Sequence, residues 1–489
     1  MTTDREISKE VRCHQGIRVI YVLLLCVAAS IAALSLYLRL FHPTYYAFSI
    51  FDPTIGWWGW ALSLIAIAPI ILGRGPSKRT KLIVPAVCIL ILAAFQSFIL
   101  GRSLFAADVP GDFSMNFRGA LEIYGKLASP YSISGSVSFP FPTYIIYWFS
   151  SLAGRLTISQ SFSLFVIANS LIWLSVAALL WKHYKVGEFD PHSRLLFVLL
   201  FLNSSAFDAF AGTGQTTVFV SLALAIMLVS FSKAGLRWFL LGGAAAGTAA
   251  LIKPQVSIVL VGLVVILFHQ IWKREQINHL VASLAGAVAA FASLIGISLL
   301  FPSGLKLQTY SEFFTSVLPS LSDPGASRVW STFGIMRGNA SPIALIVSGL
   351  SGVFGVNPSR LSSIATIAGL LAFSILTFRT SRSRLELAIL PWLFAPLFLT
   401  QVTWSYSSVW IVPAFLFVFS RQLGSNDRRM PFLFFAGYGL LRVGPNALAL
   451  MALCILFTLL LQSLSEGVKV DHLRVTPADK LENEFARIA

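Results

Sequence analysis

Charged residues are scarce in this chain: Asp, Glu, Lys and Arg make up 11% of its 489 residues, against about 25% in soluble domains. Hydrophobic residues make up 56%, and forty residues are phenylalanine. So little charged surface could not keep a folded domain of this length in water, and so apolar a chain is neither disordered nor fibrous. A membrane protein that crosses the bilayer several times remains.

Cysteine and histidine are also few, which excludes several kinds of site. The four cysteines have no paired spacing, so neither a disulfide framework nor a zinc site is expected. Of the seven histidines, only His42 falls in a segment predicted to lie on the outer face of the membrane. The chain lacks a GxxxxGK(S/T) loop, a GxSxG elbow and an HExxH pair, so P-loop, hydrolase and zinc-protease chemistry lack their residues. No metal and no cofactor is expected.

Apolar runs of the length that a spanning helix needs recur along the whole chain. Their Leu, Ile, Val, Ala and Phe residues are contiguous and do not alternate as in a membrane β-barrel. The sequence therefore predicts an all-α polytopic membrane protein with about 12–14 transmembrane helices in a single domain over residues 1–489. One predicted span covers Leu195–Gly212. The short stretches 143–152 and 344–356 leave open whether they cross the membrane.

The net charge of +16 comes from short clusters of Lys and Arg between the apolar runs. Such clusters mark cytoplasmic loops, so the expected partner is the lipid bilayer and not nucleic acid. The basic leader and the tail at 465–489 are then cytoplasmic, and no cleavable signal peptide is expected. Segments 101–140 and 302–360 fall on the outer face. The length, aromatic content and amphipathic pattern of the first predict an ordered helix on the membrane surface.

Asp112 is the first candidate for chemistry in segment 101–140. A carboxylate held beside an acceptor hydroxyl can act as a general base and take the proton as the hydroxyl attacks. The same residue would also suit a loop position or the N-cap of a helix that begins near Phe113. Asp108, four residues earlier, is the alternative base.

Lysine and arginine residues at the outer ends of the predicted spans are candidates for binding a phosphate. Lys253 follows an apolar run, where an ionisable group is costly unless it has a function or reaches the interface. It therefore is either a ligand of a lipid phosphate or an interfacial anchor. Arg328 and Arg337 in segment 302–360 suit the same phosphate, or are solvated loop charges.

Gln215 follows Gly214 at the outer end of a predicted hairpin. Its uncharged amide suits sugar hydroxyls, or would satisfy backbone groups at a helix end. Asp208 precedes Gln215 by two helical turns and would share its face if the helix continues that far. Asp208 is then either part of the site or a partner for Lys253.

The order of these motifs resembles a known family. An acidic residue opens the first outer loop (Asp112-Phe113-Ser114), a Pro-Tyr follows it (Pro130-Tyr131), then Gly214-Gln215, a Gly/Ala-rich run over 242–250, and Lys253-Pro254. In this respect the chain resembles the multi-pass GT-C glycosyltransferases, and among them the family that includes bacterial polyprenol-phosphate-mannose-dependent α-1,2-mannosyltransferases. Where that family often has Ser-Trp followed by histidines, this chain has Thr403-Trp404-Ser405-Tyr406-Ser407 without a histidine.

The resemblance implies a GT-C-type fold with helices in its outer loops, in the bacterial inner membrane with the active site facing outward. It implies transfer of mannose or another hexose or pentose from a polyprenyl-phosphate donor to a hydroxyl of a lipid-linked or glycan acceptor, with inversion. Asp112 would be the base, and Lys253 with Arg328 or Arg337 would stabilise the departing phosphate. The expected substrate-binding residues are Gln215, Asp208, Tyr131, Trp404 and Tyr406. A transporter or flippase, and an O-antigen-ligase-like enzyme, are the alternative functions.

Overall fold

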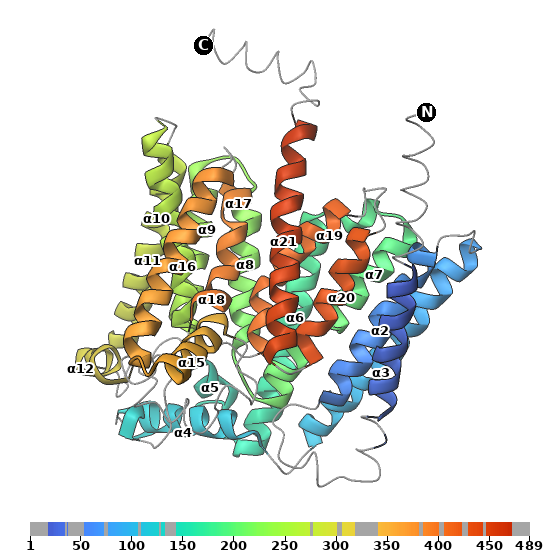
Figure 1. Cartoon of the computed structure of the whole chain (residues 1–489). Helices are drawn as coiled ribbons and strands as arrows, with labels where there is room; N and C mark the ends of the chain where they lie inside the picture. The colour runs from blue at the N-terminus through green and yellow to red at the C-terminus, as the bar shows by residue number, and fades with distance from the viewer. Residues whose placement is uncertain are drawn as a thin grey trace.

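A computed structural model describes residues 18–34, 37, 53–72, 77–105, 109–126, 129–132, 143–273, 277–300, 306–317, 341–380, 385–400, 405–422, 429–443 and 446–471. Within these ranges every regular element is a helix and there is no strand, so the all-α prediction is confirmed for them. The helices form an upright bundle, with several shorter helices at one end (Figure 1). Arg328, Arg337, Trp404 and Asp108 lie outside the described residues, and so does the predicted tail beyond Asp471.

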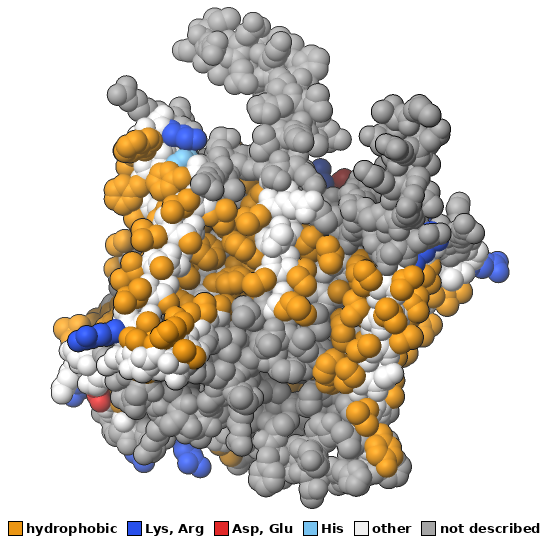
Figure 2. Space-filling view, in the orientation of Figure 1, with side chains coloured by type: hydrophobic (Ala, Val, Ile, Leu, Met, Phe, Trp, Pro, Cys, Tyr) orange, Lys and Arg blue, Asp and Glu red, His pale blue; other side chains and the backbone are white. Residues whose placement is uncertain are grey.

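Five helical stretches are long and apolar enough to cross a membrane. They lie in α3 (Lys78–Phe105), α6 (Ile158–His183), η5 with α10 (Pro254–Val256 and Ser257–Trp272), α11 (Asn278–Leu300) and α16 (Pro358–Thr380). In α16 the exposed apolar side chains Ile364, Ile367, Leu371 and Ile375 follow a helical repeat. Figure 2 shows hydrophobic side chains covering the flank of the bundle. A face of this kind meets lipid, and the chain is a helical membrane protein.

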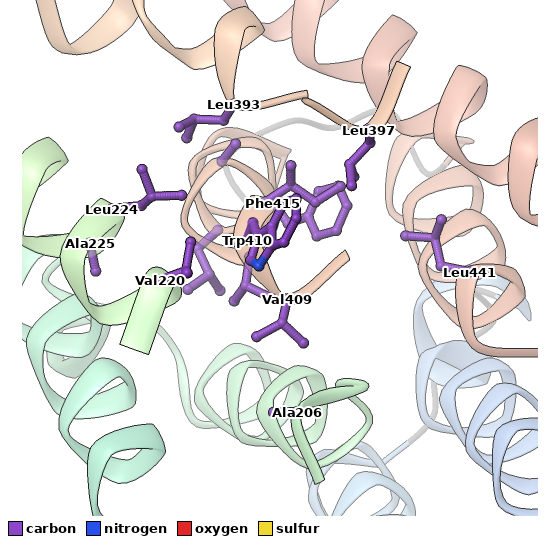
Figure 3. Packing of buried hydrophobic residues seen from close by; sticks show 14 of the residues in the cluster. Ala206, Val220, Leu224, Ala225, Leu393, Leu397, Val409, Trp410, Phe415 and Leu441 are labelled. Carbon is purple, nitrogen blue, oxygen red and sulfur yellow. The ribbon is translucent and has the colours of Figure 1, made fainter. Parts of the chain in front are cut away.

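The other helices of the bundle pack beside these five. They are the helix Arg18–Leu34, α2 (Pro53–Leu72), α7 (Pro191–Leu202), α8 (Thr217–Phe231), α9 (Leu236–Ile252), α17 (Leu385–Ala388), α18 (Leu390–Leu399), η7 (Ser405–Ile411), α19 (Val412–Gln422), α20 (Arg429–Val443) and α21 (Asn446–Asp471). Helix α8 is buried along most of its length. Figure 3 shows its Val220 and Leu224 near Trp410 of η7 and Leu393 of α18. Buried apolar side chains thus join helices far apart in sequence.

Helices α9 and α11 pack with their backbones almost in contact. A Cβ atom added to Gly243 of α9 would lie 1.7 Å from the carbonyl oxygen of Ser283 in α11. Gly286 of α11 faces the Leu240 carbonyl of α9 in the same way, at 2.0 Å. Small residues at such positions let helices approach closely, and this supplies packing energy inside a membrane. The glycine-rich run at 242–250 therefore has a packing role in this structure.

The predicted continuous span over Leu195–Gly212 is wrong. Helix α7 ends at Leu202, and a π-helix, η4 (Asp208–Gly212), follows after a break. At the break the Asn203 amide donates to Ser63 Oγ at 2.8 Å, and Ser204 Oγ donates to the Phe201 carbonyl at 2.8 Å. Polar side chains of this kind compete with the backbone hydrogen bonds of a helix. The apolar pattern did not reveal the break because these residues stand among many apolar ones.

The helices at the lower end of the bundle in Figure 1 come from the two predicted outer segments and their surroundings. They are α4 (Gly111–Gly125), η2 (Pro130–Ser132), α5 (Thr143–Ser150), α12 (Leu307–Glu312), the π-helix η6 (Phe313–Val317) and α15 (Pro342–Phe354). The helix predicted within 101–140 is present as α4 and runs across the bundle end. The eight residues of α5 and the thirteen of α15 extend about 12 and 20 Å. Both are short of the roughly 30 Å hydrocarbon core.

Candidate active site

Asp112 lies in the first turn of α4, and the helix fixes its position. Pro110 occupies the N-cap, and the Ser114 N–H donates to its carbonyl at 2.9 Å. No side chain caps this helix, so Asp112 is neither its N-cap nor a loop residue. A carboxylate in the first turn is favoured by the helix dipole. The carboxylate of Asp112 thereby remains available for contacts outside its own helix.

Gln215 connects Asp112 to Lys253 through two hydrogen bonds. Its Nε2 donates to Asp112 Oδ2 at 2.8 Å, and Lys253 Nζ donates to its Oε1 at 2.6 Å. The amide matches both partners, because its NH2 group faces the carboxylate and its carbonyl faces the ammonium. We call Asp112, Gln215 and Lys253 the polar triad. Three residues singled out in the sequence, far apart along the chain, meet in one place.

Gly214 lets the loop before α8 lie directly against α4. Its φ is +75°, and a Cβ there would lie 2.4 Å from the Cβ of Phe113. The Tyr147 hydroxyl donates to the Gly214 carbonyl at 2.8 Å, and the Gln215 N–H donates to the Ala209 carbonyl at 2.8 Å. Only glycine suits both the backbone conformation and the close approach. The Gly-Gln pair thus positions the amide beside Asp112.

A cluster of aromatic rings holds the start of α4. Phe113 is fully buried and contacts Phe162 and Phe165 of α6 and Tyr147 of α5, with ring centroids 5.0 to 5.5 Å apart. Edge-on contacts of this kind add to the burial of apolar area. The Asn116 amide also donates to the Asp112 backbone carbonyl at 2.8 Å. These contacts fix the start of α4 and with it the position of the Asp112 carboxylate.

Lys253 lies between α9 and η5, in extended backbone with φ −136° and ψ 100°. Pro254 begins η5, and the Thr143 hydroxyl of α5 donates to the neighbouring Ile252 carbonyl at 3.2 Å. The ammonium group of Lys253 points to Gln215 and donates a hydrogen bond to it. Burial lowers the pKa of Lys253 to about 8, and the nearby Asp112 carboxylate opposes this shift. Lys253 is thus partly buried and hydrogen-bonded inside the protein.

Two threonine hydroxyls next to the polar triad have no hydrogen-bond partner among the described residues. Thr216 and Thr217 follow Gln215 at the start of α8, and their side chains are almost fully buried. Neither Oγ1 makes a hydrogen bond with any residue that the structure describes. Buried hydroxyls without a partner are uncommon and are often satisfied by a ligand or water. The start of α8 also favours a negatively charged group.

The other predicted site residues lie in different positions. Tyr131 is in η2, and its ring centroid is 6.2 Å from that of Phe313 in η6. Asp208 lies in η4, but Gln215 lies in the loop beyond that helix, so the two do not share a helical face as expected. The side chains of Asp208 and Tyr406 are outside the described part of the structure.

Three residues that support the polar triad were not singled out in the sequence. They are Tyr147, Asn116 and Thr143. The aromatic pattern Tyr144-Ile145-Ile146-Tyr147-Trp148 in a short helix was a signal that such residues could line a site. Among the described residues no group of three His, Cys, Asp or Glu side chains could hold a metal ion.

Comparison with known proteins does not assign a family or a function to this site. No family model matches the chain, and neither the curated proteins nor the solved structures contain a match.

Proposed function

We propose that this chain is a membrane glycosyltransferase of the GT-C type, which transfers a sugar from a polyprenyl-phosphate donor to an acceptor hydroxyl. The polar triad carries this proposal, because it joins a carboxylate and an ammonium group at one end of the bundle. A base and a phosphate-binding cation are the two charged groups that such a transfer needs. The motifs that resemble the GT-C family supply these same three residues.

In the proposed reaction Asp112 acts as the base. Gln215 occupies its Oδ2, while Oδ1 accepts no hydrogen bond from any described residue. Oδ1 would take the proton of the acceptor hydroxyl as that oxygen bonds to the anomeric carbon of the donor sugar. The bond from this carbon to the phosphate oxygen breaks on the opposite face, and its electron pair leaves with the polyprenyl phosphate. Such a displacement inverts the anomeric configuration.

Lys253 would stabilise the negative charge that develops on the departing phosphate. A preorganised cation at the place where charge appears lowers the barrier, particularly where water is excluded. Thr216 and Thr217, which follow Gln215 in the chain, supply two buried hydroxyls that could donate to phosphate oxygens. Arg328 and Arg337 are proposed as further cations.

The proposal includes a location and partners. In this proposal the polar triad faces the outside of a bacterial inner membrane, where polyprenyl-linked sugars present their headgroups, and the positively charged loops on the opposite side support that orientation. The acceptor is a lipid-linked saccharide or a glycan, and the donor sugar is mannose or another hexose or pentose.

The experiment is a transfer assay with purified protein in nanodiscs and a panel of polyprenyl-phosphate sugars, mannose first. Asp112→Asn should lower kcat/KM by at least ~100-fold, the scale of a general base. Glu122→Gln is the matched control, because Glu122 lies on the same helix and pairs with Lys126 at 2.8 Å. Near-normal turnover by a folded Asp112→Asn variant would contradict the proposed role of Asp112. Absence of transfer by the unmodified protein with every donor would contradict the function.

A further inference from the structure

A second group of polar side chains lies at the same end of the bundle, outside the polar triad. The Ser129 hydroxyl, just before η2, donates to Glu312 Oε2 of α12 at 3.0 Å. This bond joins parts of the chain that are 183 residues apart. Glu312 is partly exposed, and its second oxygen, Oε1, accepts no hydrogen bond from any described residue. A carboxylate held in place with one oxygen free is available to a ligand.

Tyr131 lies near Glu312, since its ring packs against that of Phe313, the residue after Glu312, with centroids 6.2 Å apart. Tyr131 of η2 is close enough to Glu312 and to Tyr310 for their charges to interact, and Tyr310 interacts in turn with Tyr124 of α4. Burial raises the pKa of all three tyrosines, so each phenol stays neutral and can donate a hydrogen bond. We call Tyr124, Tyr131, Tyr310 and Glu312 the tyrosine–glutamate cluster.

One phenol of this cluster lacks an internal partner. The Tyr124 ring lies on Trp148, with centroids 5.2 Å apart and planes inclined by 32°. Its hydroxyl is buried and makes no hydrogen bond with any residue that the structure describes. Leaving a buried hydroxyl without a partner is unfavourable in free energy. A ligand hydroxyl that reached Tyr124 would recover part of that free energy.

The cluster adjoins the polar triad through α5. Tyr131 interacts electrostatically with Tyr144, Tyr144 with Tyr147, and Tyr147 with Asp112. Tyr147 also donates to the Gly214 carbonyl, next to Gln215. A molecule with one hydroxyl at Asp112 could therefore extend along α5 towards Glu312.

The composition of the cluster indicates what kind of ligand it would bind. A carboxylate accepts hydrogen bonds from hydroxyl groups, phenols both donate and accept, and aromatic faces pack against apolar C–H surfaces. A neutral sugar offers both hydroxyls and C–H faces. The Glu312 carboxylate repels a phosphate, and a single carboxylate does not hold a divalent cation. The cluster is therefore chemically distinct from the cationic end of the polar triad at Lys253.

We propose that Tyr124, Tyr131, Tyr310 and Glu312 form a subsite for a neutral sugar residue of the acceptor, at the same end of the bundle as the reacting hydroxyl at Asp112. This inference rests on the proposed function and names the class of acceptor: a neutral saccharide that occupies more than the reacting position.

Binding is tested first without any reaction. Saturation-transfer difference NMR on the full chain in nanodiscs, with mannotriose as the probe, gives a dissociation constant for each variant. Glu312→Gln and Tyr131→Phe should each raise this constant at least ~5-fold, which corresponds to the loss of about 1 kcal/mol, one hydrogen bond. Both substitutions keep the shape of the side chain. Glu122→Gln, on α4 but paired with Lys126 and not with the cluster, should leave the constant unchanged.

A charged probe checks the chemistry of the subsite. Trigalacturonic acid should bind more weakly than mannotriose to the unmodified protein, and this difference should shrink in Glu312→Gln because the repelling carboxylate is gone. Equal mannotriose binding by the unmodified protein, Glu312→Gln and Tyr131→Phe would overturn the inference.

The transfer assay separates this inference from the proposed function. If the protein transfers sugar but Glu312→Gln leaves the KM for a mannotriose-containing acceptor unchanged, the subsite is wrong and the function stands. If mannotriose binds through Glu312 but no donor supports transfer, the proposed function fails and the sugar-binding site stands.

Discussion

Gly214→Ala tests the contact on which the polar triad depends. The substitution adds a methyl group where φ is +75°, and this group would lie 2.4 Å from the Cβ of Phe113. The backbone conformation alone costs an alanine about 1–2 kcal/mol. Relieving the overlap requires the loop or α4 to move, at about 1–3 kcal/mol as for other overpacked sites. Together these predict a loss of about 2–5 kcal/mol of stability.

Gly355→Ala is the matched control for this prediction. Gly355 follows α15, has a φ of +63° and has no atom within 4 Å of its added Cβ. It should therefore lose only the backbone contribution of about 1–2 kcal/mol. Thermal unfolding of both variants in the same nanodiscs, at one scan rate, measures the difference.

The same pair of variants connects the contact to activity. Because Gly214 precedes Gln215, moving the loop separates the amide from Asp112, and transfer should fall at least ~10-fold in Gly214→Ala and stay normal in Gly355→Ala. Equal unfolding temperatures for the two variants would refute the close approach of the loop to α4. Unchanged transfer by Gly214→Ala would refute the dependence of the site on this contact.

Two further substitutions probe charge and packing. Lys253→Ala should markedly reduce kcat/KM for the donor while the unfolding temperature changes little. Because burial lowers the pKa of Lys253 to about 8, the lysine loses its charge above that pH, and the wild-type transfer rate should decline as pH rises through that value. Lys253→Arg should keep its charge and carry the decline to higher pH, and a profile identical to that of wild type would assign the decline to another group. Gly243→Val should separate α9 from α11 and lower the unfolding temperature markedly, because its Cβ would lie 1.7 Å from the Ser283 carbonyl oxygen. Gly296→Val, on α11 with no atom within 4 Å of its Cβ, should have a much smaller effect on that temperature.

The helical class of this protein could be predicted because apolar composition and run length determine it directly. Long runs such as Asn278–Leu300 and Ile158–His183 lie within a few residues of the predicted ends. The break between α7 and η4 could not be predicted in this way. It depends on a hydrogen bond from Asn203 to Ser63, 140 residues away, which no local pattern records.

The polar triad was predicted in its members but not in its connections. Asp112, Gln215 and Lys253 could be selected from the sequence because polar and charged residues at the ends of apolar runs are costly and often have a function. The sequence suggested that Gln215 contacts a sugar, whereas in the structure its amide is used by Asp112 and Lys253. The spacing of seven residues also suggested that Asp208 and Gln215 share one face of a helix, which required the helix to continue as far as Gln215. Which polar side chains meet depends on how the helices pack, and this is not local information.

The glutamine between the two charges has an electrostatic consequence for the site. A lone ion would be expensive to bury at this end of the bundle, but the carboxylate and the ammonium cancel each other in sum, and each is hydrogen-bonded to the same neutral amide. The protein can therefore fold with both charges in place before any substrate arrives. The result is a fixed dipole about one amide long, whose negative pole attracts a proton and whose positive pole attracts an anion.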